Sequence, residues 1–264
     1  MRTTSDTLVT ESFVSALYER YAEGLRRVRQ EQRELYDRHR RAGGRAQLDD
    51  LEAEISYLLV RHTRPAALVE IGCLHGWSTS WLLRALRDNR EGTLYSFDRT
   101  GAARRWVPPE LSEGRWLFTE GDVRERVAEL PDDIGYLFLD AAHSARFARW
   151  YLRTLLPRLA PGTVVSVHDV HHRARPLPGT EGAELLRWLC TAGITSFTVA
   201  AAKAPDVNAR LRRLRVELGL AEPVHSGADD PMVFFTTPHP AGHSGPSLAE
   251  PAAAPGRVGH AEPR

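Results

Sequence analysis

The sequence has few cysteines, no long apolar run and almost no net charge. Its two cysteines, Cys73 and Cys190, are too few for a disulfide framework and are not spaced as metal ligands, which is typical of a reducing cytoplasm. No apolar run reaches the roughly 18 residues of a membrane span, and residues 1–12 lack the apolar stretch of a signal peptide. The 35 Lys and Arg residues balance 34 Asp and Glu residues, so no overall field attracts nucleic acid or an anionic membrane. We therefore expect a cytoplasmic protein with no nucleic-acid or membrane partner.

The two ends of the chain differ in composition from its middle. Residues 238–264 are rich in proline, glycine and alanine and almost free of large aliphatic residues, so we expect a disordered tail. Residues 10–41 and 48–62 carry apolar side chains at every third or fourth position, which predicts two amphipathic helices. We expect residues 1–62 to form a helical arm. It would pack on the core by one stripe, close over a site as a lid, or pair two copies into a homodimer.

Short apolar runs alternate with helical patterns between residues 63 and 237. This alternation predicts one α/β domain with a doubly wound, Rossmann-like, seven-stranded, mostly parallel sheet, to which the N-terminal helices are an extension. The expected strands lie at residues 67–71, 93–97, 116–119, 136–139, 163–167, 196–200 and 232–236. The expected helices between them lie at residues 78–88, 123–130, 145–156, 182–191 and 205–218.

The turn after the first predicted strand contains two glycines. Gly72 and Gly76 would let a ligand lie against bare backbone, and Ser78 stands near the start of a helix. In open α/β sheets, ligands bind beyond the carboxyl ends of the strands, where this turn lies. Its G-x-x-x-G spacing departs from the G-x-G-x-x-G of dinucleotide sites, and no Gly-Lys-Ser/Thr of a P-loop follows. The turn therefore favours a ligand other than a pyrophosphate.

Acidic residues close the next two predicted strands. Asp98 ends the second strand about 20 residues past the glycines, where a carboxylate can accept hydrogen bonds from two ribose hydroxyls. Asp122 follows Gly121 at the end of the third strand. Either aspartate alone could be a helix N-cap, but acidic residues at successive strand ends point to one ligand site.

With these motifs the sequence resembles class I S-adenosylmethionine-dependent methyltransferases. In that family an acidic residue followed by G-x-x-x-G forms the first motif, and a G-D pair at the third strand lies by the adenine. The resemblance implies S-adenosylmethionine as cofactor. The implied cofactor-binding residues are Glu70, Gly72, Gly76, Ser78, Asp98, Asp122 and Asp140.

Polar residues also end the fourth and fifth predicted strands. The fourth strand leads into D-A-A-H at residues 140–143 and the fifth into H-D-V-H at residues 168–171. Neighbouring parallel strands end at the same cleft, so these side chains should converge. Carboxylates and imidazoles suit a divalent ion such as Mg²⁺, Mn²⁺, Zn²⁺ or Fe²⁺. The expected metal ligands are Asp140 and Asp169 together with a nearby histidine, first His168 and His171 and otherwise His143 or His172.

This arrangement is similar to the catechol and caffeoyl metal-dependent O-methyltransferases and to their bacterial natural-product relatives. In the catechol pattern, D-x-x-K and then D-N, two Asp and the Asn bind the metal and the Lys is the base. Asp140 and Asp169 stand at the aspartate positions and His143 at the lysine position, where a neutral imidazole is a competent base near pH 7. Val170 replaces the asparagine, which removes one ligand unless a neighbouring histidine takes its place. Without a metal, Asp140 would only orient His143.

The resemblance implies methyl transfer to a hydroxyl of a small molecule, a natural-product or sugar intermediate, with His143 and Asp140 as the catalytic residues. Methylation of nucleic-acid amines is not indicated, because the N/D-P-P-Y/F motif of such enzymes is absent after the fourth strand. Two alternatives stay open. The fold could perform a non-methylating metal-dependent reaction, or the chain could be a non-catalytic partner protein that binds the cofactor and dimerises.

Overall fold

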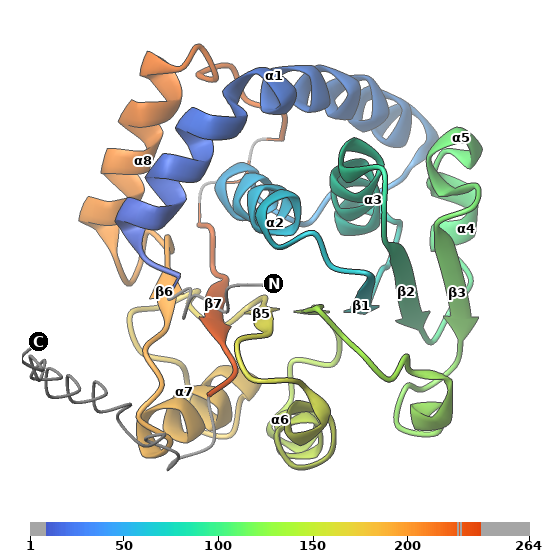
Figure 1. The fold of residues 1–264 in the computed structure, drawn as a ribbon. Coiled ribbons are helices and arrows are strands. Elements are labelled where there is room, and N and C mark those ends of the chain that lie inside the picture. The colour runs from blue at the N-terminus through green and yellow to red at the C-terminus, as the bar shows by residue number, and fades with distance from the viewer. Residues whose placement is uncertain (1–8, 226, 228, 239–264) are drawn as a thin grey trace, which may run out of the picture.

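The computed structural model describes residues 9–225, 227 and 229–238, and within them the chain forms one seven-stranded sheet flanked by helices (Figure 1). The strands are β1 Ala67–Ile71, β2 Thr93–Asp98, β3 Trp116–Glu120, β4 Tyr136–Leu139, β5 Val164–Val167, β6 Phe197–Thr198 and β7 Val233–Thr236. Their order in the sheet is β3-β2-β1-β4-β5-β7-β6. Strands β1 to β5 run parallel, and β7 runs antiparallel to β5 and β6. The predicted Rossmann-like, mostly parallel sheet is confirmed.

Helices precede the sheet and connect its strands. They are α1 Glu11–Ala42, α2 Asp50–Thr63, α3 Trp77–Asn89, α4 Ala103–Trp106, α5 Pro109–Ser112, α6 Ala145–Trp150, α7 Glu181–Thr191 and α8 Pro205–Glu217. Shorter turns are the 3-10 turns η1 Val127–Glu129 and η3 Leu156–Arg158 and the π-turn η2 Tyr151–Leu155. Within the described part of the chain, none of the helices combines the length and the apolar character that crossing a membrane requires.

Some predicted elements are shorter than expected. The helix predicted at residues 123–130 is reduced to η1, because the Asp122 side chain accepts from the Arg124 amide in a local turn and Pro131 follows at once. The strand predicted at residues 196–200 is reduced to β6, because the Thr198 hydroxyl accepts from the amide of Ala200 and ends the ladder. The four-residue helices α4 and α5 were not predicted, since one helical turn is too short to show a period.

Five strands each contribute to two cores, one on each face of the sheet: β1, β2, β4, β5 and β7. In β4, Tyr136 and Phe138 belong to one buried cluster, whereas Leu137 and Leu139 belong to the other, as the two-residue period of a strand requires. Figure 1 shows α1, α2, α3 and α8 over one face and α6 and α7 over the other. Because both faces are covered, the strands are nearly continuous apolar runs.

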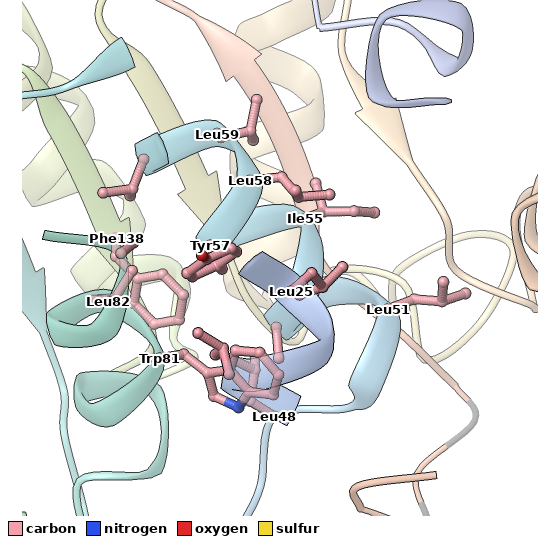
Figure 2. Close-up of a cluster of buried hydrophobic side chains, with 14 of the residues drawn as sticks. Leu25, Leu48, Leu51, Ile55, Tyr57, Leu58, Leu59, Trp81, Leu82 and Phe138 are labelled. Carbon is pink, nitrogen blue, oxygen red and sulfur yellow. The ribbon is translucent and has the colours of Figure 1, made fainter. Parts of the chain in front are cut away.

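The N-terminal helices are part of the larger core. Figure 2 shows Leu51 and Ile55 of α2 close to Leu25 of α1, with Trp81 of α3 nearby, and all four are fully buried. Each large apolar side chain buried in this way contributes about 1.5–3 kcal/mol. The domain boundaries at residues 62 and 237 stay predictions, and residues 239–264 of the predicted tail lie outside the described residues.

A buried carboxylate ties three helices together on this face. Glu54 of α2 accepts a hydrogen bond of 2.9 Å from the Tyr18 hydroxyl of α1 and forms an ion pair with Arg29 of the same helix. It also accepts a bond of 3.0 Å from Nη2 of Arg215 in α8. The charged positions of α2 therefore face protein partners rather than solvent.

Candidate active site

Two glycines shape the turn between β1 and α3. Gly72 has a φ of +90°, and a Cβ atom there would lie 1.8 Å from the carbonyl oxygen of Asp140. Gly76 has a φ of +73°, and its Cβ would lie 2.5 Å from a side-chain carbon of Val107. Only glycine therefore lets the turn pass this close to the end of β4 and begin α3.

A cavity of about 380 Å³ opens at the carboxyl ends of β1 to β4, within the size range of small-molecule sites. Five of the seven residues predicted to bind the cofactor line it: Gly72, Ser78, Asp98, Asp122 and Asp140. The other two, Glu70 and Gly76, do not line it. Arginine side chains also line the cavity, so its walls carry both signs of charge: Arg45, Arg99 and Arg124.

Glu70 supports the turn from below. Its carboxylate is fully buried and accepts hydrogen bonds from the hydroxyls of Ser78, Thr79 and Ser96 at 2.7, 2.8 and 2.6 Å. Burial raises the pKa of this carboxyl to about 7, although the hydroxyls oppose that shift. The Ser78 hydroxyl is thereby directed at Glu70, so both side chains hold the shape of the glycine turn.

Asp98, at the end of β2, holds the same turn from the cavity side. Its Oδ2 atom accepts from the amides of Cys73 and Leu74 at 2.8 and 3.0 Å, and its Oδ1 atom accepts from the amide of Thr100 at 2.9 Å. The carboxylate therefore joins the first two strand ends of the cavity. A carboxylate in this place can accept further hydrogen bonds from a ligand, because each oxygen offers two lone pairs.

Asp122, beyond β3, is paired within its own loop. Its Oδ1 atom accepts from the amide and the Nε atom of Arg124 at 3.0 and 2.9 Å. Hydrogen bonds from Arg124 lower the pKa of Asp122 to about 2, so the carboxylate is ionised at neutral pH.

Three side chains form a compact cluster beyond β4 and β5. One ligand atom each of Asp140, His143 and Asp169 lies within 4.8 Å of the other two. The Nε2 atom of His143 is 3.2 Å from Oδ2 of Asp169 and 3.7 Å from Oδ1 of Asp140. His143 and Asp169 have φ angles of +43° and +56°, and strain of this kind is frequent at functional sites. The structure thus brings together the two strand ends that the sequence predicted to converge.

Carboxylates surround the His143 ring. Its Nδ1 atom is 3.6 Å from Oε2 of Glu181, on the side away from the two aspartates. Burial by itself lowers the pKa of this imidazole, but Glu181, Asp169 and Asp140 outweigh burial and raise the pKa above its ordinary value. These carboxylates therefore stabilise the protonated form of the ring.

His168 lies behind this cluster and is buried. Its Nε2 atom is 2.8 Å from Oε1 of Glu52 in α2. Its Nδ1 atom is 3.2 Å from Oδ1 of Asp140 and 3.0 Å from Oδ1 of Asp169, yet makes no hydrogen bond. Burial lowers the pKa of His168, but the carboxylates of Glu52 and Asp140 outweigh it and raise the pKa well above its ordinary value.

The other predicted histidine, His171, does not join the cluster. Its amide donates to the carbonyl of Pro231, and burial together with nearby Lys203 lowers the pKa of its buried ring. The structure therefore does not support His171 as a metal ligand. His172 contacts the site instead: its Nε2 atom is 2.8 Å from Oδ1 of Asp169.

Glu181 is a site residue that sequence reasoning missed. It is the first residue of α7, directly after the N-cap Thr180, where an acidic residue is expected for the helix alone. Its side chain is nevertheless buried beside His143, and burial raises the pKa of its carboxyl. The chain pattern contains no signal that separates such a residue from a solvated one.

A second cavity, of about 220 Å³, lies between the cluster and the segment that links β5 to α7. His143 lines both cavities, so ligands in the two would meet at its ring. Asp169 and Glu181 lie on the cluster side of the second cavity, and further walls come from the linking segment: His172, Arg173, Pro176 and Leu177.

Part of the chain is similar to known proteins. Residues 69–170 match the family model of a methyltransferase domain. No curated protein matches the chain. An O-methyltransferase from Bacillus cereus, solved in complex with SAH, is 18% identical, with 78% of this chain and 90% of that chain covered and a TM-score of 0.54. The O-methyltransferase TomG from Streptomyces achromogenes, solved in complex with SAM, is 18% identical, with 82% and 90% covered and a TM-score of 0.50.

The matched residues run from β1 to just past β5 and include the carboxyl ends of all five strands. The segment that leads from β5 to α7 lies outside the match. At these identities the likeness to solved structures shows the fold, and the family model adds the domain. Residues 69–170 thus match a methyltransferase domain and the solved structures share the Rossmann-like fold, in agreement with the resemblance drawn from the motifs.

Proposed function

We propose that the chain transfers the methyl group of S-adenosylmethionine to a hydroxyl of a small molecule. The larger cavity would hold S-adenosylmethionine and the smaller cavity the acceptor. One observation carries this proposal: His143 lines both cavities. A base at their junction can take the proton of an acceptor hydroxyl while the protein aligns that oxygen with the methyl donor.

For methyl transfer the protein must mainly align the acceptor oxygen with the methyl group and supply a base. S-adenosylmethionine supplies a methyl group on a sulfonium, so the acceptor oxygen forms its bond to carbon as the carbon–sulfur bond breaks. In this step the hydroxyl proton passes to the His143 ring. Glu181 and Asp169 then stabilise the resulting imidazolium from its two sides, at 3.6 and 3.2 Å.

The cluster also fits a divalent metal ion. The carboxylates of Asp140 and Asp169 offer hard oxygen donors, and the buried Nδ1 atom of His168, which makes no hydrogen bond, is aimed at both of them. Asp140 and Asp169 would hold the ion. When bound, it would lower the pKa of the acceptor hydroxyl and help to position its oxygen.

Two measurements test the proposal. Calorimetric titration of the protein with S-adenosylmethionine and with S-adenosylhomocysteine should show binding of both. Formation of S-adenosylhomocysteine should then depend on an added hydroxylated acceptor from a panel of small phenols and sugars, and a chelator should lower the rate until Mn²⁺ or Mg²⁺ is restored. Absence of affinity for either cofactor form would overturn the proposal.

Other sequence-based expectations stay predictions. These are a cytoplasmic location, a natural-product or sugar acceptor, and a homodimer formed through the N-terminal helices.

A further inference from the structure

A buried pair of side chains connects α2 with the acidic cluster. His168 is only 5% exposed, and its two ring nitrogens face different partners. Nε2 contacts Glu52, from a helix that precedes the methyltransferase motifs, whereas Nδ1 lies within 3.2 Å of both Asp140 and Asp169 without a hydrogen bond. Nδ1 therefore stands at ion-pair distance from the same two carboxylates that would hold a metal ion.

Glu52 is fixed as an acceptor. Its Oε1 atom accepts from the amide of Asp49 at 2.9 Å, its Oε2 atom accepts from the amide of Met232 at 3.1 Å, and the residue is fully buried. Because both oxygens already accept from amides, we read the contact of 2.8 Å to His168 as the ring donating from Nε2 to the carboxylate. The nitrogen that can release its proton to a metal ion is therefore Nδ1.

We infer that Glu52 is a positioning residue, which holds His168 so that its Nδ1 atom becomes the third protein ligand of a divalent ion bound by Asp140 and Asp169. This inference rests on the proposed function. A histidine that binds a metal usually donates its other N–H to a carboxylate, which fixes the orientation and tautomer of the ring. The Glu52 and His168 pair has that arrangement.

This assignment separates the roles of two histidines. With His168 as ligand, His143 is free to act as the base at the junction of the two cavities. It also accounts for Val170, which stands where the catechol group has a third ligand, because His168 supplies the missing donor from the same strand end. One nitrogen with two carboxylate oxygens favours Mn²⁺, Fe²⁺ or Zn²⁺ over Ca²⁺.

The test compares two isosteric substitutions in α2 of the full-length protein, Glu52→Gln and Glu54→Gln. Both side chains are fully buried carboxylates, but Glu54 contacts Arg29 and Arg215 instead of the cluster. Mn²⁺ affinity is measured by electron paramagnetic resonance. Thermal unfolding and S-adenosylhomocysteine binding are recorded for each variant.

Glu52→Gln should weaken Mn²⁺ binding by about 10- to 100-fold, as the loss of a partner of a ligating histidine does. Glu54→Gln should leave the affinity for Mn²⁺ within about twofold even if its unfolding temperature falls further. Equal losses of affinity in the two variants would reduce Glu52 to a structural role and overturn the inference, as would an unchanged affinity in Glu52→Gln.

A second measurement needs no variant. Nitrogen-15 spectra of the histidine rings should show the Nδ1 resonance of His168 shift on addition of Zn²⁺ while its Nε2 keeps its proton. A shift confined to His143 would overturn the inference and leave the methyl-transfer proposal standing. If the wild-type protein bound neither Mn²⁺ nor Zn²⁺, the metal part of the proposed function would fail first, and the inference with it.

Discussion

The carboxylates at the two halves of the sheet edge have different partners. At the ends of β2 and β3, Asp98 is held by backbone amides and Asp122 by an arginine. At the ends of β4 and β5, Asp140 and Asp169 face the rings of histidines instead. Both halves belong to one matched domain and one continuous edge, but in the second half the partners are imidazoles, which exchange protons near neutral pH.

The different partners of the carboxylates indicate different functional roles for the two halves. Amides and arginine keep their protons across the physiological range, so the first half can only bind and shape a ligand. The imidazoles of the second half can take up a proton or give one up for a metal ion. Substitutions in the first half should therefore change cofactor affinity, and substitutions in the second half should change turnover.

The largest expected effect of a substitution is on turnover, in the half of the edge at β4 and β5. His143→Ala should lower turnover by roughly 10²–10⁴-fold, because it removes the base between the two cavities, while the affinity for S-adenosylhomocysteine should change little. Steady-state rates and calorimetry measure the two quantities. His172→Ala is the control, since His172 also contacts Asp169 but lines only the second cavity. Unchanged turnover in His143→Ala, or an equal loss in both variants, would remove His143 as the base.

The next effect concerns stability and arises beneath the first half. Because the pKa of Glu70 is raised from 4.5 to about 7 in the folded protein, the folded state binds more protons than the unfolded state between these values. The free energy of unfolding therefore falls as the pH rises through this window, by up to about 3 kcal/mol from this one group. Glu70→Gln cannot ionise and should lose this dependence.

Denaturant unfolding at pH 5 and pH 8 measures this effect. The free energy of unfolding of Glu70→Gln, taken relative to wild type, should rise by up to about 3 kcal/mol from the lower to the higher pH. Asp230, whose pKa burial also raises to about 7, is present in both proteins and cancels in the comparison. A relative stability independent of pH would mean that Glu70 is ionised in the fold at both pH values.

A smaller effect, on cofactor affinity, is expected for a substitution of Asp98. It tests directly whether the half at β2 and β3 serves to bind the cofactor. Asp98→Ala should weaken S-adenosylhomocysteine binding by about 10- to 100-fold, because hydrogen bonds to a charged group contribute about 1.5–3 kcal/mol and the turn at Cys73 and Leu74 loses its acceptor. Turnover at saturating S-adenosylmethionine should change much less. A loss confined to turnover would contradict the assignment of this half to binding.

The contrast between the halves also explains what the sequence could reveal. Within three residues of a predicted strand lie Asp98, Asp122, Asp140 and Asp169, and parallel strands end at one edge, so local pattern is enough to place them together. Glu52 lies 116 residues before His168. Its contact depends on how α2 packs over the sheet, which no periodicity encodes. The same holds for Glu181, whose position reads as an ordinary helix start.

The smallest expected effect is on cofactor affinity and distinguishes the role of Asp122 from that of Asp98. Asp122 forms an ion pair with Arg124 in an exposed loop. Exposed pairs of this kind contribute about 0–1 kcal/mol of interaction free energy. Asp122→Asn should therefore weaken S-adenosylhomocysteine binding by only about twofold to fivefold in calorimetry. Asp98, by contrast, holds the glycine turn itself. If Asp122→Asn weakened binding as much as Asp98→Ala, the carboxylate of Asp122 would have to leave Arg124 and contact the ligand, and the third strand end would then be as much a part of the cofactor site as the second.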